Sequence, residues 1–140
     1  MQIDIVGSGP SLVLVHSLLT DSRAFESVAS TLSTKHRVVR VSLPGFGTTP
    51  PMEIDAPTIY DLADTVAAAL DQADVEQDAA VLGNGLGAFV CVALAIRHGD
   101  RFGPLIVANG GAVFTDERRA TFTHMSDLVT AGGMDAVVDV

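Results

Sequence analysis

Short runs of β-branched and aliphatic residues alternate with segments of helical periodicity along this chain, and that alternation limits the folds open to it. Five runs have the composition of strands: residues 2–6, 12–16, 37–43, 79–83 and 105–109. Helical patterns follow the second to the fifth of these runs. Parallel strands need long crossover connections, usually through a helix. The order therefore predicts an α/β fold, a mainly parallel sheet with helices on both faces.

Composition and charge exclude several classes of partner. The 140 residues are 48% hydrophobic and 18% charged, which allows one buried core and argues against disorder. Eight Lys and Arg against seventeen Asp and Glu give a net charge of -9, so no basic surface is expected for nucleic acid. The sequence has no apolar run of about 18 residues and no secretory signal, so we expect no membrane association and a cytoplasmic location.

The sequence predicts neither a metal site nor a cofactor. Cys91, the single cysteine, lies in an apolar segment and is interpreted as a small core residue. The four histidines lack the spacing and the acidic neighbours of a metal site. We therefore expect any chemistry here to rest on backbone groups and on ordinary side chains.

Capping residues mark the helix boundaries. Asp21 or Ser22 is expected to begin one helix, and Thr58, with an acidic residue three positions later, predicts a capping box at the start of another. The segment 86–98 is apolar on all sides and predicts a deeply buried helix. Gly99 is expected to adopt the left-handed conformation that often ends a helix.

Three turns follow predicted strands. They are His16-Ser17-Leu18, Leu43-Pro44-Gly45-Phe46-Gly47 and Gly83-Asn84-Gly85-Leu86-Gly87. In open parallel sheets, binding and catalytic sites lie outside the carboxyl ends of the strands. We therefore expect the three turns to meet at one edge of the sheet.

In their order and spacing these turns resemble those of the α/β-hydrolase superfamily, most closely its small esterase, lactonase and C–C hydrolase branch. The resemblance runs from residue 2 to about residue 114. It implies that residues 1–114 are the N-terminal part of a hydrolase core and that residues 115–140 begin a helical cap. It also implies a small ester, lactone or other carbonyl compound as the substrate.

The sequence departs from the family at the nucleophile elbow, whose pattern is G-x-S-x-G. Gly85 stands at the nucleophile position and has no side chain that could attack a carbonyl, whereas the flanking Gly83 and Gly87 are kept. Gly85 is either natural, in a non-serine branch or an inactive protein, or an engineered replacement of serine. Ser17 replaces the usual glycine of a His-Gly turn, and its hydroxyl is a candidate pocket group or displaced nucleophile.

The backbone part of the family's site does not depend on these changes. The resemblance implies an oxyanion hole made by the N–H groups of Leu18 and Leu86. It gives the histidine at the end of the second strand a mainly structural role. The candidate pocket residues are His16, Ser17, Asn84 and Asn109.

A hydrolase triad also needs an acid and a histidine that follow the nucleophile along the chain. The resemblance places both after the last residue here, and Asn109 stands where some relatives carry an acid. An apolar stripe at Ala136, Val137, Val138 and Val140 has no later residues to cover it. We therefore expect the N-terminal half of a protein roughly twice as long, completed by its C-terminal half or by a second chain.

Two other functions fit parts of the pattern. Gly83-x-Gly85-x-x-Ala88, between a predicted strand and helix, matches the phosphate loop of dinucleotide-binding folds. Against this reading, the motif follows an interior strand, and Asn109 stands where a ribose-binding acid is expected. The second alternative is a catalytically dead binding or scaffold protein that keeps the pocket without the nucleophile.

Overall fold

The computed structural model describes residues 1–110 and 115–137. The chain divides into two compact units, Met1–Gly110 and Gly111–Val140. The first unit holds the whole sheet and the candidate site residues. The boundary predicted between residues 114 and 115 lies beside an undescribed segment and stays a prediction.

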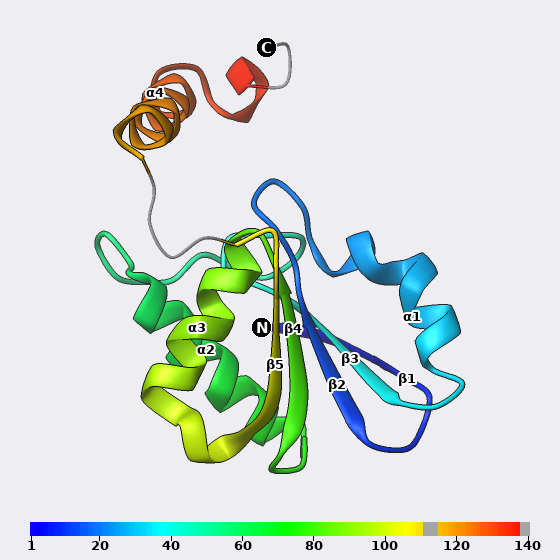
Figure 1. The fold of residues 1–140 in the computed structure, drawn as a ribbon. Coiled ribbons are helices and arrows are strands. Elements are labelled where there is room, and N and C mark those ends of the chain that lie inside the picture. Colours follow the sequence, from blue (N-terminus) through cyan, green and yellow to red (C-terminus); the bar gives the residue numbers. More distant parts are fainter. Residues whose placement is uncertain (111–114, 138–140) are drawn as a thin grey trace. The chain divides into compact units, whose positions relative to one another are not determined.

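The first unit is built on a five-stranded sheet with the order β1-β3-β2-β4-β5 (Figure 1). β1 pairs antiparallel with β3, and the other neighbours are parallel. The predicted α/β class is therefore confirmed. The strands are β1 (Gln2–Val6), β2 (Ser11–Val15), β3 (Arg37–Ser42), β4 (Ala79–Asn84) and β5 (Phe102–Ala108).

Helices cover both faces of this sheet, as Figure 1 shows. Successive side chains of β2 point to opposite faces. Leu12 and Leu14 pack in a cluster with Ala29 of α1, whereas Val13 and Val15 join the larger core beneath α2 and α3. The helices are η1 (Ser22–Phe25), α1 (Glu26–Leu32), α2 (Ile59–Gln72), α3 (Leu86–His98) and η2 (Gly99–Arg101).

Two predicted caps are confirmed. The Asp21 carboxylate accepts a hydrogen bond from the Arg23 N–H at the start of η1. At α2, the Thr58 hydroxyl accepts from the Asp61 N–H while the Asp61 carboxylate accepts from the Thr58 N–H, which completes a capping box.

The start of β5 was predicted too late. The sequence predicts this strand only from residue 105 because Gly103 and Pro104 disfavour strands, but β5 lies at a sheet edge, where proline is tolerated.

Two helix predictions are wrong. α3 is not buried on all sides, because Val92 and Ile96 are 45% and 65% exposed on the face turned away from the core. Gly99 has φ of -54° and ψ of -38°, so it is right-handed. The chain continues directly from α3 into the 3₁₀ turn η2, which leaves no left-handed residue between them.

The second unit contains α4 (Asp116–Gly132) and η3 (Met134–Val137). Thr115 caps α4, and Gly133 ends it with φ of 72°. The helical pattern expected after the fifth strand-like run is confirmed by α4, and Val138 and Val140 of the predicted apolar stripe lie outside the described residues. Among the described residues, no helix combines the length and apolarity that a membrane span requires.

Candidate functional site

The three turns meet at the carboxyl edge of the sheet, as predicted. β2, β3, β4 and β5 are parallel neighbours, so their C-terminal ends lie side by side. The turn after β4 is tied to both neighbouring strands. The Gly87 N–H donates to the His16 carbonyl at 2.9 Å, and the Gly85 N–H donates to the Ala108 carbonyl at 3.0 Å.

Gly85 bends the chain sharply between β4 and α3. Its φ of 56° and ψ of -113° lie in a region that strains residues with a side chain. α3 begins at the next residue, and the Ala88 N–H donates to the Gly85 carbonyl at 3.0 Å. Strand, turn and helix are therefore joined without an intervening loop.

Glycines on either side of this bend allow backbone to lie against backbone. A Cβ at Gly87 would lie 2.6 Å from the Val15 carbonyl carbon and 2.8 Å from the His16 carbonyl oxygen. A Cβ at Gly83 would overlap the Gly87 carbonyl and lie 2.6 Å from the Cys91 sulfur. Both positions thus exclude any side chain, whatever chemistry the turn performs.

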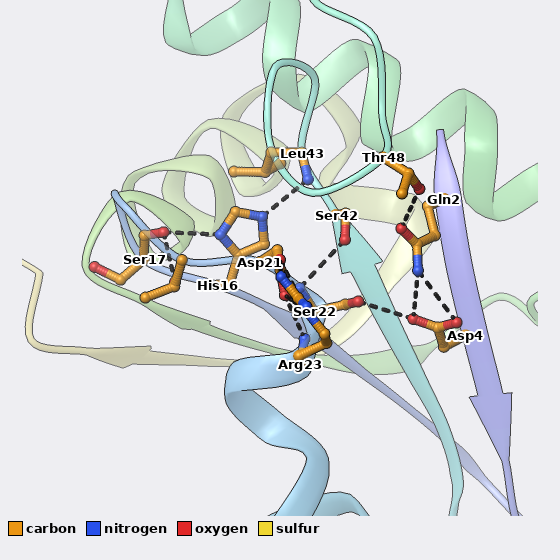
Figure 2. A network of polar contacts seen from close by, with 11 residues as sticks. Gln2, Asp4, His16, Ser17, Asp21, Ser22, Arg23, Ser42, Leu43 and Thr48 are labelled. Atoms are coloured by element: carbon orange, nitrogen blue, oxygen red, sulfur yellow. Dashed lines mark hydrogen bonds and ion pairs between the residues drawn. The ribbon is translucent and has the colours of Figure 1, made fainter. Parts of the chain in front are cut away.

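Ser17 lies directly beside the bend. A Cβ on Gly85 would lie 2.9 Å from the Ser17 Cβ and far inside van der Waals contact of the Ser17 hydroxyl oxygen. Figure 2 shows that the Ser17 carbonyl, and not its hydroxyl, takes part in the local hydrogen bonds. The two positions are 68 residues apart, so the sequence alone did not predict that they touch.

The N–H groups of Leu18 and Leu86 donate to no backbone or side-chain acceptor within residues 1–110 and 115–137. Leu86 is the first residue of α3, and the first N–H groups of a helix have no intrahelical acceptor. Leu18 is 37% exposed, just after β2. The two residues follow Gly85 and Ser17, which touch, so both N–H groups belong to the same edge of the sheet.

His16 joins two of the three turns (Figure 2). Its ring is fully buried, and its Nδ1–H donates to the Ser17 carbonyl at 2.8 Å while its Nε2 accepts from the Leu43 N–H at 3.0 Å. Phe46 meets the ring edge-on at 5.2 Å between centroids. Burial lowers the pKa of His16, so the ring is held neutral in one tautomer. This geometry supports a structural role.

A polar network that the sequence did not predict joins β1, η1 and the end of β3, and Figure 2 draws its contacts between Asp4, Ser22 and Ser42. The Ser22 N–H donates to the Ser42 hydroxyl at 3.2 Å, and the Ser22 hydroxyl donates to Asp4 at 2.8 Å. The Thr49 hydroxyl donates to the Ser42 carbonyl at 2.9 Å and accepts from the Gln2 N–H at 2.9 Å. Ser42 and Thr49 are buried in the structure. In the sequence, the only signal of this network is a serine at the end of a strand and a threonine in the loop that follows it.

Asp21 adds a fixed negative charge close to His16. Hydrogen bonds from Arg23 lower the pKa of Asp21 to about 2. Because the Asp21 carboxylate is occupied by Arg23 at 2.6 Å, it serves the loop and its cap, not proton transfer.

The remaining candidates take different places. Asn84 ends β4, and Asn109 follows β5 with φ of 51°, so both lie at the carboxyl edge. Cys91 is fully buried, and burial raises the pKa of its thiol to about 12, as expected of a core residue. The described residues contain no group of three or more potential metal ligands.

Comparison with known proteins places these features in a family. The model of the alpha/beta hydrolase family matches residues 12–138. Pimeloyl-[acyl-carrier protein] methyl ester esterase of Aeromonas hydrophila is 32% identical in an alignment of 117 positions that covers 81% of this chain and 43% of that protein. The same-named protein of Chromobacterium violaceum is 31% identical, over 82% of this chain and 43% of its own. The chain thus spans less than half the length of these relatives.

Solved structures share the fold. The enol-lactonase from Burkholderia xenovorans LB400 is 27% identical, with a TM-score of 0.85 over 99% of this chain and 53% of that one. A thermophilic esterase from Thermogutta terrifontis is 22% identical, with a TM-score of 0.86 over 94% of this chain and 48% of that one. The second similarity bears on the fold alone.

Proposed function

The chain belongs to the alpha/beta hydrolase family, and on that premise we propose that its carboxyl-edge site acts on a small ester, lactone or other carbonyl substrate. The observation that carries the proposal is the pair of unoccupied N–H groups, at Leu18 and Leu86, beside the bend at Gly85. A carbonyl oxygen placed between them gains two hydrogen bonds as it becomes negatively charged.

Such backbone donors act in the transition state more than in the ground state. In working enzymes, losing one oxyanion donor costs about 10²–10³ in kcat. The N-terminus of α3 adds positive potential at Leu86, which stabilises the same developing charge. The proposal needs no side chain at Gly85 for this part of the chemistry.

The relatives agree in substrate chemistry. The Aeromonas hydrophila protein is named as a methyl ester esterase, and the Burkholderia xenovorans protein as an enol-lactonase. Esters and lactones share a carbonyl carbon bonded to a leaving oxygen. We extend that substrate class, and no single substrate, to this protein.

The remaining machinery is also a proposal. We place the catalytic acid and histidine in a C-terminal half or a second chain, and we assign residues 115–140 to the start of a cap. His16, Asn84 and Asn109 are proposed to shape the pocket at the ends of β2, β4 and β5. We further propose that the protein acts in the cytoplasm.

One backbone substitution tests the oxyanion role. Leu86→Pro removes the N–H, and proline is well tolerated at the first position of a helix because that N–H has no helical acceptor. We expect the natural full-length protein to hydrolyse p-nitrophenyl acetate and kcat to fall about 10²–10³-fold in L86P. Leu86→Ala keeps the N–H and should lose much less than L86P.

The outcomes separate the alternatives. A folded wild-type protein without ester turnover indicates the catalytically dead binding protein. Calorimetric binding of NAD or FAD that Gly85→Val abolishes indicates the dinucleotide site at Gly83-x-Gly85-x-x-Ala88. Equal turnover in L86P and L86A contradicts the oxyanion assignment.

A further inference from the structure

The Ser17 side chain occupies the space that an elbow side chain would take. A Cβ at Gly85 would overlap the Ser17 hydroxyl oxygen and lie 2.9 Å from the Ser17 Cβ. The Ser17 Cα is 3.5 Å from the same point, which is an ordinary contact. The space between positions 17 and 85 therefore has room for only one of the two side chains. A glycine at position 17 would leave room for a Cβ at position 85.

The sequence shows which position holds it here. The turn that resembles the family's His-Gly carries serine at 17, and the turn that resembles G-x-S-x-G carries glycine at 85. Relative to that pattern the two residues are exchanged. Between these two positions one hydroxyl is kept, and the turn after β2 supplies it in place of the turn after β4.

The exchange preserves the relation between the hydroxyl and the two free N–H groups. Leu18 follows Ser17, and Leu86 follows Gly85, so each N–H belongs to the residue after one of the two touching positions. A hydroxyl on either position is therefore followed in the chain by one of the two N–H groups, and the other N–H group lies in the neighbouring turn. No described residue hydrogen-bonds the Ser17 hydroxyl, and the side chain is partly exposed.

We propose that Ser17 Oγ is the nucleophile of this protein, in place of a serine at the elbow; the inference rests on the proposed esterase function. Ser17 Oγ bonds to the carbonyl carbon, the bond from that carbon to the leaving oxygen breaks, and the serine proton leaves with the alcohol. Water then cleaves acyl-Ser17, which releases the acid and returns a proton to Oγ.

The proton relay has to come from outside this turn. His16 is the nearest imidazole in sequence, but its Nδ1–H donates to the Ser17 carbonyl and its Nε2 accepts from the Leu43 N–H. Neither nitrogen is free to take the serine proton. We place the acceptor on an imidazole or carboxylate of the C-terminal half or second chain proposed above, and His16 is a positioning residue that fixes the Ser17 backbone.

Labelling of the natural full-length protein tests the assignment without a known substrate. Diisopropyl fluorophosphate reacts by forming an Oγ–P bond and breaking the P–F bond, with loss of HF. We expect one stoichiometric adduct, which peptide mass spectrometry places on Ser17. Ser17→Ala should fold with the wild-type circular dichroism, take up no label and lose p-nitrophenyl acetate turnover by about 10³-fold or more.

Two further variants test the exchange itself through stability. Gly85→Ser alone should lower Tm, because its Cβ overlaps Ser17. The double variant Ser17→Gly/Gly85→Ser should regain most of that loss, and its label should move to residue 85. The recovery of Tm does not depend on activity.

The experiments distinguish a wrong assignment of Ser17 from a wrong proposed function. Wild-type turnover that Ser17→Ala retains, or a wild-type adduct on another residue, overturns the nucleophile and leaves the ester function standing. A double variant no more stable than Gly85→Ser overturns the exchange. Absence of both label and turnover in the wild type, and in the double variant as well, overturns the proposed function together with this inference.

Discussion

His16 shows how a single side chain can organise the candidate site without taking part in its chemistry. It is buried, neutral and bonded at both ring nitrogens to backbone groups of two different turns. Losing the ring leaves the Leu43 N–H without an acceptor in a buried place, which costs about 1–3 kcal/mol beyond the packing loss. The order of the Ser17 and Leu43 turns thus depends on one imidazole.

This arrangement predicts a pH dependence of stability. Because burial lowers the pKa of His16 in the folded state, the unfolded chain binds the proton more readily. The contribution of His16 to the free energy of unfolding is therefore fully present above the pKa of about 6.5 that histidine has in the unfolded chain, and it is lost as the pH falls below that value. Urea unfolding of the full-length protein at pH 7.5 and pH 5 should show a lower midpoint at pH 5.

His16→Asn and His124→Asn form a matched pair for this prediction. His16→Asn should lower the free energy of unfolding by about 2–4 kcal/mol at pH 7.5. It should also reduce the difference in the free energy of unfolding between pH 7.5 and pH 5. His124 is exposed on α4, so its substitution should leave both quantities near those of the wild type. An unchanged pH difference in H16N would show that other groups cause it.

Sequence reasoning predicted His16 as a structural residue but could not supply its partners. The ring nitrogens hydrogen-bond to the backbone carbonyl of Ser17 and the backbone N–H of Leu43. Because the partners are backbone groups, the residue types at 17 and 43 do not indicate these bonds. The contact between Ser17 and Gly85 was not predicted from the sequence for a related reason. It depends on side-chain placement between neighbouring strands, whereas each turn was recognised from its own local composition.

At the scale of elements, the start of α3 lies against the ends of β2 and β4 with no room for a Cβ between the backbones. Glycine makes this close approach possible, because it alone lets a helix backbone lie against a strand carbonyl. The structure supplies the contacting atoms: the carbonyls of Val15 and His16 stand where a Cβ of Gly87 would be. Backbone atoms cannot rotate away, so relief requires moving the whole helix.

Gly87→Ala should therefore destabilise the full-length protein by about 3 kcal/mol or more. The matched substitution is Gly99→Ala, at the other end of α3, where a Cβ meets nothing within 4 Å and φ is -54°. That change should be neutral or stabilising by about 0.4–1 kcal/mol. Differential scanning calorimetry measures both, and equal Tm values for the two variants would contradict the packing argument.

Element order and most boundaries followed from the sequence, while burial did not. The composition of α3 predicted burial on all sides, yet Val92 and Ile96 are exposed. Hydrophobicity reports what an element would bury, and not whether a neighbour is present to cover it. The start of β5 was missed for another reason, because Gly103 and Pro104 disfavour strands.

At the scale of the whole molecule, the first unit has an open side at β5. β5 is an edge strand, and its adjacent residues Ile106 and Val107 are 47% and 48% exposed. Adjacent strand residues face opposite sides of the sheet, so neither face is covered there. Unpaired edges with exposed apolar side chains favour association between chains.

We expect residues 1–140, prepared alone, to self-associate with increasing concentration in sedimentation velocity. Ile106→Lys should weaken that association, because a charge then stands on the exposed β5 edge. Val28→Lys introduces the same charge on α1, where Val28 is similarly exposed, and should have little effect. A polypeptide that stays monomeric at every concentration contradicts this expectation.

The central claim is that the bend at Gly85 and the turn at Ser17 bind a carbonyl oxygen through two backbone N–H groups. A crystal structure of the full-length protein with a trifluoromethyl ketone tests it most directly. We expect the ketone oxygen to lie about 2.7–3.1 Å from both the Leu18 and the Leu86 nitrogens. A ketone oxygen bound by other groups, with those two N–H groups left to solvent, would contradict it.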